Sequence, residues 1–185
     1  MHKFKKIHLF CFVLLLFSKN SFSLNNESVN NNCFLINKID LIGSNLLDYR
    51  SKSKIISPYL QQCLTSNKIK KIAELITHNY IKKGYVTSQA IIEEQEISNH
   101  KLVIKIIEGR IKDISINGVS SRLVDIIFPS FKGAILNLRE LEHGLEQLNR
   151  LTTSQYTLDI KPSDSVGYSS IFIVQNNKKL LLKIN

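Results

Sequence analysis

The chain has few of the residue patterns from which small-molecule sites are built. Its 185 residues include seven glycines, and none of these lies in a G-x-G-x-x-G or G-x-x-x-x-G-K sequence that would cradle phosphate groups. None of its serines lies in a G-x-S-x-G sequence, the turn that presents a nucleophilic serine. The sequence therefore predicts no nucleotide cofactor and no serine nucleophile.

Clustered metal ligands and acid–base pairs are also missing from the sequence. The three histidines beyond the N-terminal segment, His78, His100 and His143, fall on a predicted helix, a loop and another helix. A zinc site needs three or four convergent ligands. The glutamates between positions 93 and 96 have no evident acid or base partner, and a polar strand end is the better interpretation. We therefore expect no metal, no small-molecule substrate and no catalytic residue.

The sequence has no apolar run long enough to cross a membrane. The longest, from Ile7 to Phe17, has 11 residues, whereas a membrane-spanning helix needs about 20. Three lysines precede this run, and small side chains at Ser21 and Ser23 follow it. This arrangement is typical of a secretory signal peptide over residues 1–23, and the chain is expected to be exported.

The net charge of +10 at first suggests a nucleic-acid partner. The predicted signal peptide contains four basic residues and no acidic one, so its removal lowers the charge to +6. The remaining lysines are dispersed in short pairs, as on solvated helix ends, and an exported chain rarely meets nucleic acid. A nucleic-acid partner is therefore not expected.

Only Cys33 and Cys63 remain once the signal peptide is removed. In an oxidising compartment an even number of cysteines indicates a disulfide bond. Two unpaired, buried thiols are the alternative.

A weak internal repeat divides the rest of the chain into two similar halves. Ile36–Gly43 and Ile111–Gly118 match at an offset of 75 residues, and each is predicted to be a strand that ends in a glycine turn. A helix with an apolar stripe follows in each half, at 68–83 and 138–148, after a shorter helix at 51–57 and 120–128. Two strands then close each half, at 85–93 and 101–108 and at 153–161 and 169–175. The predicted order is β-α-α-β-β, twice.

Several short motifs resemble the POTRA modules of the haemolysin secretion/activation family. Those of the first half are Cys33-Phe34, Pro58-Tyr59-Leu60, Cys63-Leu64 and Gly84-Tyr85-Val86-Thr87-Ser88. Those of the second half are Glu108-Gly109-Arg110-Ile111, Phe128-Pro129 and the 15-residue run from Asn137 to Leu151. The last run is the most specific of them.

This resemblance implies an α+β fold of two tandem POTRA modules, each with a three-stranded mixed sheet packed on two helices. It also implies the Cys33–Cys63 disulfide. Family members are outer-membrane transporters of two-partner secretion, whose periplasmic POTRA modules capture an unfolded exoprotein. The expected division is a signal peptide (1–23), a disordered spacer (24–32), POTRA module 1 (33–108), POTRA module 2 (109–175) and a tail or first barrel strand (176–185).

The expected partner site is the edge strand of the second module. An open sheet edge can add an extended guest strand through main-chain hydrogen bonds, while neighbouring side chains offer apolar pockets. The strand at 153–161, facing the helix at 122–128, is the predicted edge, although it could instead merely complete the fold. The predicted contact residues are Thr153, Gln155, Tyr156, Leu158, Ile160, Leu123, Ile126 and Ile127.

The chain departs from the family in length. Only ten residues follow Gln175, whereas the smallest outer-membrane barrels need eight strands of about 9–11 residues. A pore formed by this chain alone is therefore not expected, and a truncated transporter is the favoured interpretation. The alternatives are a stand-alone POTRA adaptor in outer-membrane protein assembly and a non-functional gene fragment.

Overall fold

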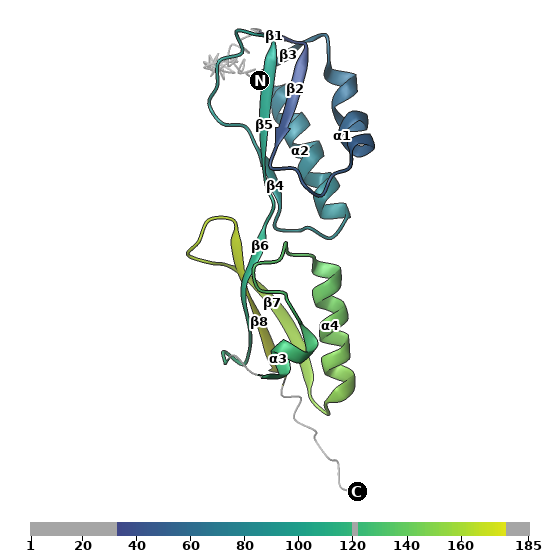
Figure 1. Cartoon of the computed structure of the whole chain (residues 1–185), viewed down its shortest axis with the longest axis vertical. Coiled ribbons are helices and arrows are strands. Elements are labelled where there is room, and N and C mark those ends of the chain that lie inside the picture. The colour runs from purple at the N-terminus through teal and green to yellow at the C-terminus, as the bar shows by residue number, and fades with distance from the viewer. Residues whose placement is uncertain (1–32, 120–121, 177–185) are drawn as a thin grey trace, which may run out of the picture. The chain divides into compact units, whose positions relative to one another are not determined.

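The computed structural model describes residues 33–119 and 122–176. The predicted signal peptide, the predicted spacer and all but the first residue of the predicted tail lie outside these residues. Figure 1 shows the elements in chain order. The first half contains β1 (Cys33–Ile36), β2 (Lys38–Ile42), α1 (Tyr49–Ile56), the 3-10 helix η1 (Ser57–Tyr59), β3 (Gln62–Thr65), α2 (Ser66–Lys82), β4 (Gln89–Ile91) and β5 (Lys101–Ile107). The second half contains β6 (Arg110–Ile116), α3 (Arg122–Ile127), α4 (Leu138–Leu151), β7 (Gln155–Pro162) and β8 (Tyr168–Asn176).

Each half forms its own three-stranded mixed sheet with the same topology. The strand orders are β2-β5-β4 and β6-β8-β7. In each sheet the first strand runs parallel to the central strand, and the edge strand that precedes the central one in sequence runs antiparallel to it. The predicted α+β fold with two β-α-α-β-β modules is confirmed, and β2 and β6 lie in different sheets.

The first module packs α2 against its sheet, with α1 beside it (Figure 1). The apolar stripe of α2 buries Ile69, Ile72 and Ile76 against Leu102 and Ile104 of β5. The helix begins after Thr65, whose side-chain oxygen accepts a hydrogen bond from the backbone amide of Lys68. Periodic burial thus positions α2 directly over the sheet.

The second module packs α4 in the equivalent way. Leu141 and Leu148 of α4 are fully buried with Ile171 and Ile173 of β8. Gly144 lies between these leucines because the ring of Phe128 occupies the space that a Cβ at this position would need. The Asn137 side chain accepts a hydrogen bond from Arg139 N–H, which caps the start of the helix as its position in the sequence suggests.

Two features of the first module differ from the sequence-based expectation. The predicted strand over 36–42 is broken at Asn37, and β1 pairs instead with β3 in a separate two-stranded sheet. The predicted strand over 85–93 is confined to Gln89–Ile91, because Val86 and Ser88 donate their backbone amides to the turn carbonyls of Gly84 and Tyr85. Local turn bonds here override the strand propensity of the segment.

A disulfide bond joins Cys33 of β1 to Cys63 of β3, with the two Cα atoms 5.2 Å apart. It is the pairing expected from the sequence. The bond lies in the small β1–β3 sheet, so it ties the beginning of the described chain to the segment just before α2.

Candidate peptide-binding edges

The predicted strand β7 is an edge strand of the second sheet. It pairs with β8 from Gln155↔Asn176 to Pro162↔Ser169. The side chains of Tyr156, Leu158 and Ile160 point toward the module core and are half-buried, whereas their neighbours along the strand are exposed. Three of the predicted contact residues therefore lie on the inner face of β7.

The backbone of β7 presents peptide groups on the side opposite β8. Tyr156 donates its backbone N–H to Asn149 Oδ1 (2.7 Å) and accepts at its carbonyl from Asn149 Nδ2 (3.2 Å). Successive residues of a strand direct their peptide groups to opposite edges. The backbone N–H and C=O groups of Leu158 and Ile160 therefore point to the same outward edge as those of Tyr156, although their side chains point toward the core. Asn149 thus anchors the start of β7 to α4, and the edge beyond it faces outward.

The remaining predicted contact residues have mixed positions. Gln155 lies on β7 and Thr153 just before it, and both are exposed. Leu123 packs against the second core, Ile127 is buried within it, and Ile126 is 66% exposed.

The prediction that β7 faces the helix at 122–128 stays a prediction, because Leu123 and Ile127 of α3 share the second core with the half-buried side chains of β7. The helix with the more extensive packing on β7 is α4, whereas α3 packs mainly against α4 and β6. The 14 residues of α4 carry the longer leucine stripe, and its Asn149 bonds the backbone of β7. The α3 and β7 residues therefore meet in the second core, while α4 holds the start of the β7 edge.

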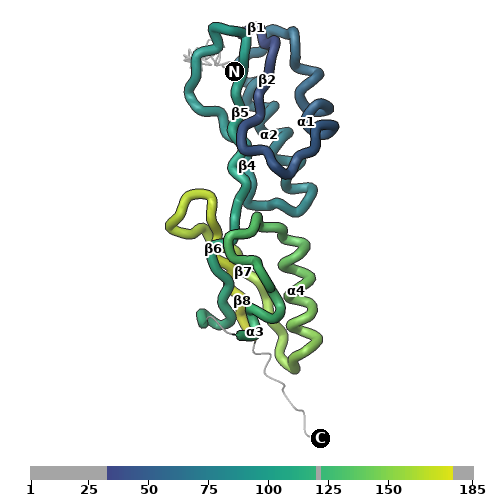
Figure 2. The backbone as a smooth tube through the Cα atoms, viewed as in Figure 1, coloured from purple at the N-terminus to yellow at the C-terminus, as the bar shows by residue number. Residues whose placement is uncertain are grey.

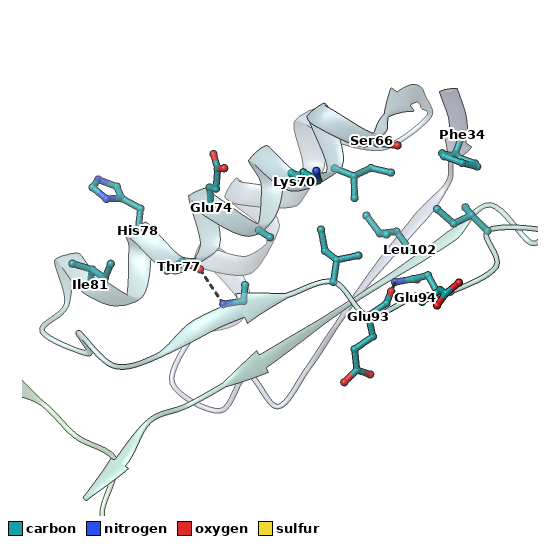
Figure 3. Close-up of a pocket in the computed structure, with 16 residues that line it drawn as sticks. Phe34, Ser66, Lys70, Glu74, Thr77, His78, Ile81, Glu93, Glu94 and Leu102 are labelled. Carbon is teal, nitrogen blue, oxygen red and sulfur yellow. Dashed lines mark hydrogen bonds between the residues drawn. The ribbon is translucent and has the colours of Figure 1, made fainter. Parts of the chain in front are cut away.

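A second candidate, which was not predicted, is a groove in the first module. It lies between α2 on one side and β4 with the loop after it on the other (Figure 3), and its volume is about 770 Å³. Figure 2 shows this loop as a teal arc that leaves β4 and returns to β5. Half of the side chains that line the groove are apolar, and these are Phe34, Ile69, Ala73, Ile81, Ala90, Ile92, Ile97 and Leu102.

A helix-to-strand hydrogen bond crosses the groove. Ala90 N–H of β4 donates to Thr77 Oγ1 of α2 at 2.9 Å, as the dashed line in Figure 3 shows. Edge strands are commonly protected by such coverage, which removes backbone donors from outside partners. The middle of β4 is therefore not open to a guest strand.

The rim of the groove carries charges of both signs. Lys70, Glu74 and His78 line it on α2, and Glu93 and Glu94 line it on the opposite loop (Figure 3). Glu93 Oε1 is paired with Lys105 Nζ at 2.7 Å. An apolar floor with a charged rim suits an amphipathic segment better than a uniformly charged one.

The described residues have neither a metal-binding cluster nor a membrane-spanning helix. No three histidine, cysteine, aspartate or glutamate side chains within residues 33–119 and 122–176 are grouped so that they could hold a metal ion. Over the same residues, no helix has the length and apolar character needed to cross a membrane.

Comparison with known families gives two adjoining matches. A family model described as "POTRA domain, ShlB-type" matches residues 34–109. A second model, described as "POTRA domain", matches residues 110–162.

Named relatives of the chain are transporters, not enzymes, which agrees with the prediction that it is not an enzyme. Outer membrane transporter CdiB from Dickeya dadantii is 37% identical over 139 residues, which are 75% of this chain and 25% of that protein. Hemolysin transporter protein ShlB from Serratia marcescens is 35% identical over 149 residues, 80% of this chain and 26% of that protein. The chain thus spans about a quarter of the length of the curated relatives it matches.

A solved structure shows the same fold. The structure of CdiB from Escherichia coli matches with a TM-score of 0.73 and 33% identity, and the match covers 77% of this chain and 27% of that one.

Proposed function

The chain belongs to the POTRA domain family of two-partner secretion transporters, and from this premise we propose that it binds an extended segment of a secreted exoprotein. The proposed binding mode is β-augmentation, in which the guest adds a strand to a sheet edge through main-chain hydrogen bonds. The proposed location is the periplasm, reached through the predicted signal peptide over residues 1–23.

The outward edge of β7 is the observation that carries this proposal. Leu158 and Ile160 present their peptide groups away from β8, in a strand whose first outward residue, Tyr156, is already bonded by Asn149. A guest strand would continue the same pattern with its own backbone groups. Main-chain pairing of this kind tolerates different guest sequences, which suits the recognition of an unfolded protein.

The names of the relatives support the class of partner. Two of them are named as a hemolysin transporter and as an outer membrane transporter. A hemolysin-type or adhesin-type exoprotein is accordingly the proposed partner of this chain. The proposed activity is capture of that partner.

A proline substitution at Leu158 tests the proposal directly. Proline removes the outward N–H, which β8 does not use, and edge strands tolerate it in that orientation. Leu158→Ala is the matched control, because it removes the same apolar side chain and keeps the N–H. Binding of the chain to the unfolded exoprotein of its own two-partner system would be measured by titration calorimetry.

We expect Leu158→Pro to weaken binding about tenfold more than Leu158→Ala does, since a backbone hydrogen bond is lost and the ring obstructs the guest. Tyr156→Pro is a less clean test, because Tyr156 N–H already binds Asn149. Equal affinities for the Leu158→Pro and Leu158→Ala variants would exclude pairing at this edge.

A further inference from the structure

In the first module, β5 extends beyond the end of its edge strand. The pairing of β4 with β5 runs from Gln89↔Ile107 to Ile91↔Lys105. Val103 lies two residues before Lys105 and directs its peptide group to the same side, because strand residues alternate with a period of two. No residue of β4 lies opposite Val103 in this register.

The side chain of Gln95 occupies that position. Val103 N–H donates to Gln95 Oε1 at 2.8 Å, and Gln95 Nε2 donates to the Val103 carbonyl at 2.8 Å. A residue of a neighbouring antiparallel strand forms the same pair of bonds with the residue opposite it. The carboxamide of Gln95 therefore imitates a peptide group at an otherwise unpaired part of the sheet edge.

Gln95 belongs to a loop with little burial. Between Ile92 and His100 no residue is fully buried, and most side chains are exposed. Segments with little burial open at low free-energy cost. The same loop supplies one wall of the apolar groove through Ile92 and Ile97, and Leu102, beside Val103, lies at its floor.

We propose that Gln95 is a displaceable occupant of a second peptide site, and that an extended segment of the exoprotein replaces its carboxamide opposite Val103. The guest peptide group takes both hydrogen bonds, and a neighbouring apolar guest side chain enters the groove between α2 and the 92–100 loop. This inference rests on the proposed function for the identity of the guest, and it adds a contact site in the first module.

The chemistry at Val103 favours an extended peptide over a helix. A helix satisfies its backbone groups internally and has no pair of them to offer to Val103. An extended segment presents a donor and an acceptor from one residue on one side. The bond from Ala90 N–H to Thr77 Oγ1 closes the neighbouring part of the edge, so the guest pairs beyond the end of β4.

The test uses the whole chain, labelled with ¹⁵N, and a synthetic peptide of alternating valine and threonine as the guest. Gln95→Ala removes the occupant. Gln62→Ala is the matched control, because the Gln62 side chain also bonds a backbone carbonyl of the same module, that of Pro58 at 2.8 Å. Dissociation constants and amide hydrogen exchange would be measured for the unmodified chain and both variants.

We expect Gln95→Ala to bind the peptide about tenfold more tightly, because two hydrogen bonds no longer have to be broken first. Gln62→Ala should bind as the unmodified chain does. In the free Gln95→Ala variant the Val103 amide should exchange faster, and the peptide should restore its protection. In the unmodified chain the peptide should shift the side-chain amide signals of Gln95 toward those of a solvated glutamine.

The inference would be overturned if Gln95→Ala did not bind the peptide more tightly than the unmodified chain does. It would also be overturned if the Val103 amide and the Gln95 side chain did not respond to the peptide. Even if the variant is destabilised, the Gln95 side-chain signals of the unmodified chain show whether the peptide displaces the carboxamide. A peptide that protects Leu158 and Ile160 but not Val103 would overturn the inference and leave the proposed function standing. A peptide that protects neither edge would contradict both.

Discussion

At the scale of single residues, Glu108, directly after β5, connects this strand to α2 and to the loop after β2 through hydrogen bonds of its carboxylate. Its carboxylate accepts hydrogen bonds from Tyr80 O–H (2.8 Å), Asn45 N–H (2.7 Å) and Leu46 N–H (2.9 Å), and the residue is 9% exposed. Burial by itself raises the pKa of Glu108, but these hydrogen bonds outweigh it and leave the pKa below its usual value. The ionised carboxylate thus joins α2 and the loop after β2 to the last strand of the module.

This arrangement predicts a stability loss in acid. A carboxyl group whose pKa is lower in the folded state stabilises fully above its unfolded pKa of about 4.3, and the contribution is lost as the pH falls through the folded-state value. We expect the free energy of unfolding, measured by urea denaturation, to fall over this range. Glu108→Gln should lack this component, because an amide does not titrate there.

Glu108→Ala should cost about 3 kcal/mol at neutral pH, since it leaves buried donors unpaired. Unfolding free energies of the unmodified chain and Glu108→Gln that change in parallel below pH 5 would contradict this role of the ionised carboxylate.

At the scale of elements, the β1–β3 sheet buries one residue of each strand, since Ile36 and Leu64 are both 0% exposed. It has two short strands, and Phe34 and Leu35 of β1 are 40% and 44% exposed. Two-stranded sheets are marginally stable alone in water. The Cys33–Cys63 disulfide therefore adds a covalent restraint on β1 to the buried contacts of Ile36 and Leu64.

Replacing both cysteines with serine should lower the free energy of unfolding of the first module. The bond closes a loop with a sequence separation of 30 residues, for which chain entropy gives about 3–4 kcal/mol. Urea denaturation followed by circular dichroism measures the change. A reductant should destabilise the unmodified chain and leave the double variant unaffected, and equal stabilities of the two oxidised proteins would contradict the prediction.

The elements that the sequence predicted well are those with a long periodic pattern. The stripe of α2 and the alternation of β5 were visible because burial repeats along the chain. The four-residue strands β1 and β3 were missed as a pair, since so short a segment carries no period. The packing of α4 on β7, and the groove beside α2, depend on tertiary contacts that periodicity does not report.

The hydrogen bonding of Gln95 to Val103 could not be predicted from the sequence either. A glutamine in a polar loop has many possible roles, and its bonds to Val103 exist only because the loop returns beside β5. The 15-residue run from Asn137 to Leu151 did identify the helix beside the second edge. It did not show that Asn149 of this run bonds the backbone of β7.

At the scale of the whole molecule, the two modules repeat one physical arrangement. Each has its own core, and each has an edge at which a side-chain carboxamide bonds both peptide groups of one strand residue. Gln95 does so in the first module and Asn149 in the second. Two such edges, together with a groove lined by apolar side chains, favour recognition of extended backbone over recognition of a folded surface.

Hydrogen exchange in the presence of the unfolded exoprotein tests the central claim most directly. If the guest adds a strand to β7, the backbone amides of Leu158 and Ile160 should gain protection, because both face away from β8 and both would donate to the guest. Amides that already pair with β8, such as that of Thr157, should change little. Binding of the exoprotein with no added protection at Leu158 and Ile160 would contradict capture at this edge.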